Sequence, residues 1–159
     1  MNNLKEVLNI SSKSKDWRAK RLSNFSDDPF VIDGVEINSV EGFIQGIKFY
    51  ENHHYRRECF RANTIKEKLR AQYLGRKMAE KKFVWWKGEK IKYGSRKHHK
   101  LIERAIRAKF EQNREAMRAL LATRGIKLIH QIGQRELKKS SLPAKLFCKI
   151  LTKIRKESF

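Results

Sequence analysis

The sequence predicts an α+β fold that is mostly helical, built as a single domain with minor β-hairpins. Only 2 prolines and 8 glycines interrupt the 159 residues, so most of the chain can form regular structure. Apolar residues recur at helical spacing along most of the chain, and two short β-rich runs flank turn-forming pairs. A chain of this length without an internal repeat or a Pro/Ser-rich linker favours one domain with its own core.

The first expected elements are an arm and a hairpin. Residues 1–16 are polar and are expected as an N-terminal arm or a short helix, so the domain is placed at 17–159. Residues 30–32 and 35–37 are β-rich and flank Asp33-Gly34. Because that pair tolerates the positive φ of a type I′ turn, these runs predict a hairpin.

A helix is expected over about 39–51, where the hydrophobic period changes to that of a helix. The apolar positions at this spacing are Val40, Phe43, Ile44 and Ile47. Asn38 and Glu41 stand three residues apart, as the two members of a capping box do. Asn38 is therefore the expected N-cap of this helix.

The middle of the chain predicts one or two strongly basic helices over 54–82, with Gly75 as a possible break. Their expected apolar side consists of Phe60, Ile65, Leu69 and Tyr73. A second hairpin is expected where 82–86 and 89–93 flank Lys87-Gly88.

The last third predicts helices at about 96–112 and 114–123, a strand within 125–130, and a C-terminal helix. A capping serine, Ser140 or Ser141, and Pro143 in the first turn are expected to begin that last helix. Its expected buried stripe is Leu146, Phe147, Ile150, Leu151 and Ile154.

Charge is the strongest compositional signal, because the formal net charge is +21. Residues 1–52 hold 7 basic and 8 acidic side chains, whereas residues 53–159 hold 31 basic and 9 acidic ones. Such one-sided charge favours a polyanionic partner, with nucleic acid ahead of an acidic membrane. A basic surface that serves only solubility is the alternative.

Several classes of protein are excluded by what the sequence lacks. No segment approaches the roughly 18 apolar residues of a membrane span, and the N-terminus has no apolar core of a secretory signal. Cys59 and Cys148 stand far apart and are expected as reduced thiols in a cytoplasmic protein. No P-loop, GxGxxG or zinc-site spacing occurs, and the paired histidines are adjacent, so neither a cofactor nor a metal is expected.

Spaced motifs give a more specific signal. They are Leu22–Phe25, Pro29-Phe30, Ile32–Gly34, Ser39–Phe49, Ala108–Asn113 and Ala119–Thr123. In this order they closely resemble the NADAR superfamily, which includes the YbiA-like proteins, and the likeness spans about residues 17–155. It implies a NADAR/YbiA-like fold and N-glycosidase activity, on ribosylated pyrimidine intermediates of riboflavin synthesis or on ADP-ribose attached to guanine in DNA.

The chain departs from the family pattern at two places. Arg124 stands where relatives have a glycine, with Gly125 following. Many relatives also have an Asp-containing, glycine-rich segment where this chain has Gly133–Glu136. An Asp from that segment is therefore absent, or Glu136 replaces it.

Glu41 is the expected catalytic residue. Cleavage of an N-glycosidic bond passes through an oxocarbenium-like ribose, which needs a carboxylate to stabilise it or to activate water. Glu41 begins the helix in the most recognisable motif of the family. Its alternative role is to close the capping box with Asn38.

The expected substrate-binding residues are Asn24, Lys48, Trp85, Trp86, Lys109 and Asn113. The Asn24 amide, in a turn-like segment, could bind the ribose or the base, or form only an Asx turn. Lys48, seven residues after Glu41, could hold phosphate, tune that carboxylate or lie in solvent. Lys109 and Asn113, four residues apart on a later helix, form a similar polar pair. Adjacent tryptophans alternate faces in a strand, so one could stack on a base while the other packs inside.

These observations favour an N-glycosidase that removes ADP-ribose, or a related ribosyl phosphate, from a guanine base in nucleic acid. The basic surface of residues 53–159 is expected to bind that nucleic acid. A riboflavin-pathway intermediate is the alternative substrate. A non-enzymatic basic protein that binds nucleic acid on the same scaffold is the alternative function.

Overall fold

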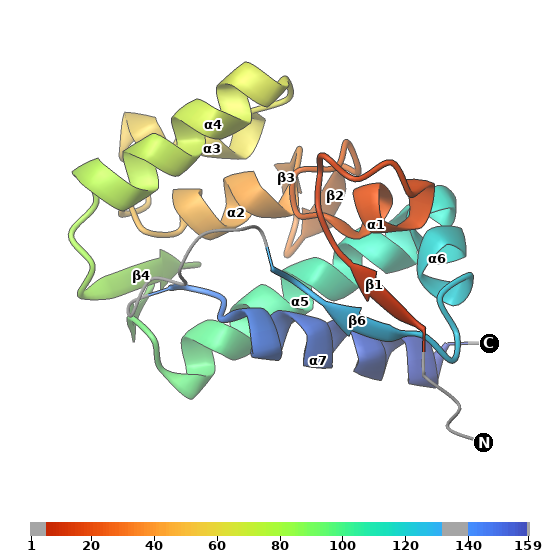
Figure 1. The fold of residues 1–159 in the computed structure, drawn as a ribbon. Helices are drawn as coiled ribbons and strands as arrows, with labels where there is room; N and C mark the ends of the chain where they lie inside the picture. Colours follow the sequence, from red (N-terminus) through yellow and green to blue (C-terminus); the bar gives the residue numbers. More distant parts are fainter. Residues whose placement is uncertain (1–5, 132–139, 159) are drawn as a thin grey trace.

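The computed structural model describes residues 6–131 and 140–158, and confirms the mostly helical α+β fold (Figure 1). The elements are β1 (Val7–Asn9), α1 (Trp17–Leu22), β2 (Phe30–Ile32), β3 (Val35–Ile37), α2 (Val40–Gly46), α3 (His54–Arg61), α4 (Ile65–Tyr73), the π-helical turn η1 (Leu74–Met78), β4 (Phe83–Trp86), β5 (Glu89–Lys92), α5 (Arg96–Gln112), α6 (Arg114–Leu121), β6 (Lys127–Ile129) and α7 (Ala144–Glu157). Helix α2 packs against α3, α4 and α5, and every one of its residues is buried. No described helix is long and apolar enough to cross a membrane.

Both expected hairpins are confirmed. Strand β2 pairs with β3 around Asp33 and Gly34, and β4 pairs with β5 around Lys87 and Gly88. All four turn residues have positive φ, between 49° and 80°, as a type I′ turn requires. The indole of Trp86 donates a 2.7 Å hydrogen bond to Asp33, so the two hairpins are joined beneath α2.

The start and the end of α2 differ from the sequence prediction. Ser39 is the N-cap and accepts a hydrogen bond from the Gly42 amide. The side chain of Asn38 instead donates to the carbonyl of Arg61, so the expected capping box between Asn38 and Glu41 is wrong. The helix ends at Gly46 rather than near residue 51, because the amides of Lys48 and Phe49 bond to carbonyls three residues back and tighten the chain into turns.

The expected apolar side of the 54–82 segment is wrong for α4. Ile65, Leu69 and Tyr73 are 71%, 53% and 55% exposed, and only Phe60 of the expected set is buried. Helix α4 instead buries Lys68 and Ala71. The reason is that the inward side of α4 meets polar groups of a loop and of α2, which are described below.

The N-terminal arm is also corrected, because strand β1 begins at Val7 and pairs in parallel with β6, Leu8 lying opposite Leu128. Three residues give too short an alternation to be detected in a sequence. At the other end, helix α7 has the expected buried stripe, with Leu146 half-buried. Its N-cap is Pro143 without a side-chain cap, since Ser141 instead shares a 2.9 Å hydrogen bond with the Tyr93 hydroxyl.

Candidate active site

A row of three buried polar side chains lies on one face of the central helix. Glu41, Gln45 and Lys48 follow at spacings of four and three residues, which brings them to the same side of α2 and of the turn after it. Their exposed fractions are 7%, 4% and 4%. Polar groups are buried in this way only where they bond to one another or serve a ligand.

The row is linked by hydrogen bonds that fix its direction. The ammonium group of Lys48 donates to Gln45 Oε1 at 2.7 Å, and Gln45 Nε2 donates to Glu41 Oε1 at 2.8 Å. Because an ammonium group can only donate, the amide oxygen of Gln45 must face Lys48 and its NH₂ must face Glu41. Gln72, from α4, donates to the same oxygen of Glu41 at 3.3 Å.

The second carboxylate oxygen of Glu41 has a different environment. No described residue donates a hydrogen bond to Oε2, and Oε2 is not among the buried side-chain atoms that lack a partner. This oxygen therefore reaches solvent while Oε1 is held by two amides. A carboxylate fixed on one side and open on the other can stabilise a developing cation or accept a proton from water.

The charge of Lys48 depends on pH in the neutral range. The pKa of Lys48 is lowered from 10.5 to about 8, chiefly by burial and to a lesser extent by the nearby charges of Lys81 and Arg76. The carboxylate of Glu41 acts in the opposite direction. Lys48 is thus cationic below pH 8 and linked through Gln45 to Glu41, an arrangement suited to tuning the carboxylate rather than to lying in solvent.

Gly75 gives the Gln45 amide its space. A Cβ at position 75 would lie 1.9 Å from Gln45 Oε1, a distance that only displacement of the amide can relieve. The π-helical turn η1 carries this glycine to the α2 surface. The break expected at Gly75 is therefore a local widening of the helix at the polar row.

We expect Gly75→Ala to displace Gln45 and to reduce turnover roughly 10–100-fold, because angstrom-scale misplacement of a catalytic array costs about that much. The protein should stay folded with a lowered melting temperature, because alanine favours a helix but the displaced amide leaves the buried Lys48 ammonium group without its acceptor. The control is a double-mutant cycle with Gln45→Ala. Once the amide is gone, Gly75→Ala should have no further effect, and a full additional loss would contradict this role of Gly75.

The segment Ser23-Asn24-Phe25, called the SNF segment below, is fixed beside Glu41. The carbonyl of Asn24 accepts a 3.0 Å hydrogen bond from the Glu41 amide. Ser23, rather than Asn24, closes the local turn, through a bond from the Phe25 amide to its hydroxyl. The Asn24 side chain is half-buried, and no described residue forms a hydrogen bond with it. Its amide is therefore available on a residue whose backbone bonds to that of Glu41, and the expected alternative of an Asx turn does not occur.

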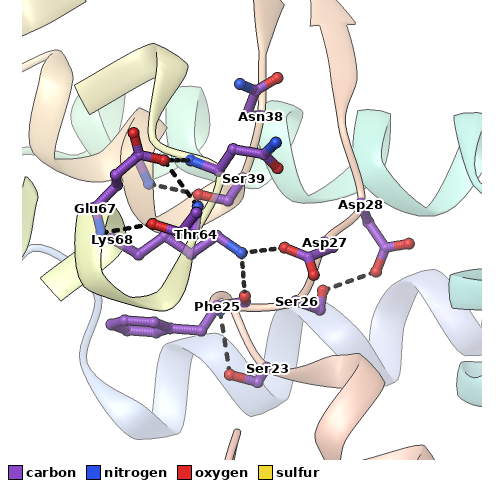
Figure 2. A network of polar contacts seen from close by, with 12 residues as sticks. Ser23, Phe25, Ser26, Asp27, Asp28, Asn38, Ser39, Thr64, Glu67 and Lys68 are labelled. Carbon is purple, nitrogen blue, oxygen red and sulfur yellow. Dashed lines mark hydrogen bonds and ion pairs between the residues drawn. The ribbon is translucent and has the colours of Figure 1, made fainter. Parts of the chain in front are cut away.

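A lysine from α4 holds the same segment from one side. Figure 2 shows the Lys68 ammonium group bonded to the Phe25 carbonyl and to the Asp27 carboxylate. Nearby, Asp28 is fully buried, accepts a hydrogen bond from Ser26 and pairs with Arg21. These contacts explain why the inward side of α4 is polar.

Lys109 and Asn113, four residues apart on α5 and at its end, hold the segment from the other side. Lys109 is 1% exposed, and its ammonium group donates to the carbonyls of Arg21 and Ser23, each at 2.9 Å. Asn113 donates to the carbonyl of Pro29 at 2.8 Å. Burial lowers the pKa of Lys109 to about 7. Both side chains thus bond to backbone carbonyls, and their contacts are those of positioning residues.

The two tryptophans occupy different environments, as adjacent residues in a strand should. Trp86 is buried and its ring contacts Phe43 and Phe60 edge-on, in the core. Trp85 is half-buried on the other face of β4, and its amide donates to the carbonyl of Ile47. No described hydrogen bond joins either indole to Glu41.

Two further features of the candidate site can be stated. Among residues 6–131 and 140–158, no group of three or more His, Cys, Asp or Glu side chains is placed to hold a metal ion. Glu136, the expected replacement for a catalytic Asp, and Gly133 lie outside the described residues.

Sequence reasoning missed three residues of this network. Gln45 stands four residues after Glu41, so its spacing alone could have identified it. Lys68 and Gln72 are also four apart, but they come from a helix whose sequence predicts the opposite orientation. Nothing local to those two residues indicates that they face the site.

Comparisons with known proteins agree with this fold. The family described as Bacteriophage protein GP30.3 matches residues 16–156. A protein of Enterobacteria phage T4, described as an uncharacterized 17.1 kDa protein in the Gp30-rIII intergenic region, is 32% identical over 120 residues, which cover 74% of this chain and 76% of that protein. N-glycosidase YbiA of Escherichia coli K12 is 30% identical over 123 residues, which cover 77% and 68%.

A solved structure shares the fold. The NMR structure of the E. coli protein YbiA superposes with a TM-score of 0.65 and 22% sequence identity. The match covers 98% of this chain and 89% of that one, so the common fold extends over nearly the whole molecule.

Proposed function

Because the chain belongs to the GP30.3 bacteriophage protein family, within the NADAR superfamily of YbiA-like proteins, we propose that it is an N-glycosidase that uses Glu41. The observation that carries the proposal is the carboxylate of Glu41, buried and held at Oε1 by two amides, with Oε2 open to solvent. Relatives named N-glycosidase YbiA, at 30% identity, support a glycosidase at the level of the family.

The proposed reaction is hydrolysis of a bond between a base nitrogen and the anomeric carbon of a ribose. As that bond breaks, its electron pair stays on the base nitrogen and the ribose gains oxocarbenium character. Oε2 of Glu41 stabilises this cation and accepts a proton from the attacking water, whose oxygen forms the new bond to the anomeric carbon. The departing base takes a proton from solvent. In the proposed reaction the half-buried amide of Asn24 bonds to the ribose or the base.

The proposed substrate is ADP-ribose, or a related ribosyl phosphate, attached to a guanine base in nucleic acid. The excess of 31 basic over 9 acidic residues in 53–159 supports a polyanion. A small diffusible metabolite gives less reason for such a charge. A base in a single strand can also reach a buried carboxylate at little unstacking cost.

A side-by-side turnover assay tests the substrate. Guanine-linked ADP-ribosyl DNA and a free ribosylaminopyrimidine phosphate are each incubated with the enzyme, and released ADP-ribose and released pyrimidine are measured by mass. We expect faster release from the modified DNA. Hydrolysis of the free metabolite alone would favour a riboflavin-pathway substrate, and no hydrolysis of either, with nucleic acid still bound, would favour a non-enzymatic binding protein.

The pH dependence of turnover should report the protonation of Lys48. Since the pKa of Lys48 is about 8, its charge is present below that pH and is lost as pH rises through it. We expect kcat to fall over this range, because neutral Lys48 polarises Gln45 less. Lys48→Arg keeps the charge at every accessible pH and should remove the fall near pH 8. A decline of unchanged midpoint in Lys48→Arg would assign the titration to another group.

A further inference from the structure

A cavity in the described part of the chain is not lined by Glu41, Gln45 or Lys48. It has a volume of about 420 Å³ and opens between β3, the outer flank of α3 and the turn that joins β4 to β5. Its apolar lining residues are Phe60, Trp86 and Val35, and the Arg56 guanidinium lies over both aromatic rings. Nothing in the chemistry described so far uses this pocket.

The rim of the pocket carries cations that are not neutralised. Arg57 and Arg61 stand four residues apart on α3 and are exposed, as is Lys87 in the hairpin turn. None of these three forms an ion pair with another described residue. Two guanidinium groups spaced one helical turn apart can bond to the oxygens of one phosphate group.

The other charged residues that line the pocket already have partners, apart from Glu36. Arg56 is buried, donates to the carbonyls of Phe49 and Trp85, and pairs with Glu51. Glu51 also accepts a bond from the Gly88 amide, so its charge is compensated and the turn is held in place. Glu36 is the remaining wall carboxylate, and no ion pair to it occurs in the described residues. Three free cations against one free carboxylate leave the rim positive.

The pocket lies close to the candidate active site. Asn38 is in its wall, and the Asn38 amide and side chain bond to the carbonyls of Phe60 and Arg61, which fixes β3 against α3. Glu41 follows three residues later, so the two Cα atoms are at most about 11 Å apart. That distance corresponds to about three nucleotide rises in a stacked strand.

We propose that this pocket binds a backbone phosphate of the nucleic-acid strand whose modified base is at Glu41. The inference rests on the proposed function for its purpose, but the binding itself needs no hydrolysis. Arg57 and Arg61 bind the phosphate oxygens, and Lys87 adds positive charge from the turn between β4 and β5. The occupant is a phosphodiester of a single strand flanking the target base.

The test measures affinity for an unmodified, end-labelled single-stranded DNA of about 12 nucleotides by fluorescence anisotropy. We expect Arg57→Ala/Arg61→Ala to weaken binding roughly 10–50-fold at about 0.1 M salt, and to reduce the slope of log affinity against log salt by about 0.7, the value for one phosphate contact on a single strand. Both side chains are exposed, so folding should persist and is checked by thermal melting.

The matched control is Lys145→Ala/Lys149→Ala, which removes the same charge from exposed positions four residues apart on α7, at the opposite side of the molecule from α3 (Figure 1). At about 0.1 M salt such distant charges are largely screened, so this pair should cost much less affinity. Equal losses from the two pairs would mean diffuse attraction and overturn the pocket. A loss confined to vesicles of anionic lipid, with the DNA affinity unchanged, would also overturn it.

The outcome is separable from that of the proposed function. The binding assay uses an unmodified strand, which the proposed reaction does not cleave, so its result does not depend on turnover. If no substrate is hydrolysed but the Arg57 and Arg61 effect is found, the proposed reaction fails and the phosphate pocket stands. If hydrolysis occurs without that effect, the reaction stands and the pocket fails.

Discussion

Glu41→Gln should reduce glycosidase turnover by roughly 10²–10⁴-fold, the usual effect of removing a positioned acid or base. Glutamine has nearly the same shape, and its Oε1 can still accept the bonds from Gln45 and Gln72. The variant should therefore melt at nearly the wild-type temperature, because the capping of α2 depends on Ser39. The measurement is kcat on guanine-linked ADP-ribosyl DNA together with a thermal melt.

The matched control for this change is Glu111→Gln. Glu111 is exposed near the end of α5 and forms no ion pair with a described residue, so the same neutralisation should leave kcat within a factor of about two. Full turnover in a folded Glu41→Gln variant would end the catalytic role of Glu41. An equal loss in both variants would instead indicate that the net charge of the protein limits the reaction.

The hairpins and the long helices could be predicted from the sequence because their signals are local. The type I′ turns at Asp33-Gly34 and Lys87-Gly88 require positive φ, and four consecutive residues are enough to form each turn. Helix α5 was predicted with its observed bounds of 96–112, since its apolar residues repeat over nearly five turns. Periodicity over such a length leaves little choice of buried face.

The errors concern groups whose partners are distant in the sequence. Asn38 has the spacing of a cap, but its amide bonds to Arg61, and Ser39 takes over the cap. Helix α4 has an apolar stripe that faces solvent, because the ammonium group of Lys68 bonds to the Phe25 carbonyl and to Asp27 on the inward side. The spacing of apolar residues predicts which face of a helix is buried when the helix is considered alone. Hydrogen bonds to distant parts of the chain can reverse that orientation.

The candidate site was predictable to the extent that it lies on α2 and the turn after it. Glu41 and Lys48 were singled out, and the structure joins them through Gln45, which the motif contained but the prediction did not use. Gln72 enters from another helix, and no spacing in the sequence relates it to Glu41. The lysine expected to contact substrate, Lys109, instead binds the backbone of the SNF segment, as only the fold could reveal.

Lys109→Met should be the most destabilising of the changes considered. It leaves the carbonyls of Arg21 and Ser23 buried without their donor, at about 1–3 kcal/mol each, offset in part by the apolar methionine. A net loss of about 2–4 kcal/mol corresponds to a fall of roughly 5–15 °C in melting temperature for a domain of this size. Turnover should fall as well, because the released segment carries Asn24, whose carbonyl bonds to the Glu41 amide.

The size of this effect should depend on pH in a defined direction. The pKa of Lys109 is about 7 in the folded protein and near 10.5 in the unfolded chain, so between these values the unfolded state binds more protons. Wild-type stability from this group therefore rises with pH, by up to about 1.4 kcal/mol per pH unit. The neutral amine keeps two N–H donors for the two carbonyls, so the contacts survive deprotonation.

The melting temperatures of wild type and Lys109→Met should therefore diverge between pH 6.5 and pH 9.5. This range begins ~0.5 unit below the pKa of the folded protein and ends ~1 unit below that of the unfolded chain. Lys149→Met, at an exposed position of α7, is the matched control and should follow the wild-type curve throughout. A gap between wild type and Lys109→Met that stays constant over this range would show that Lys109 does not titrate there. A gap that narrows with pH would mean that the charged ammonium group, rather than the neutral amine, holds the segment against Glu41.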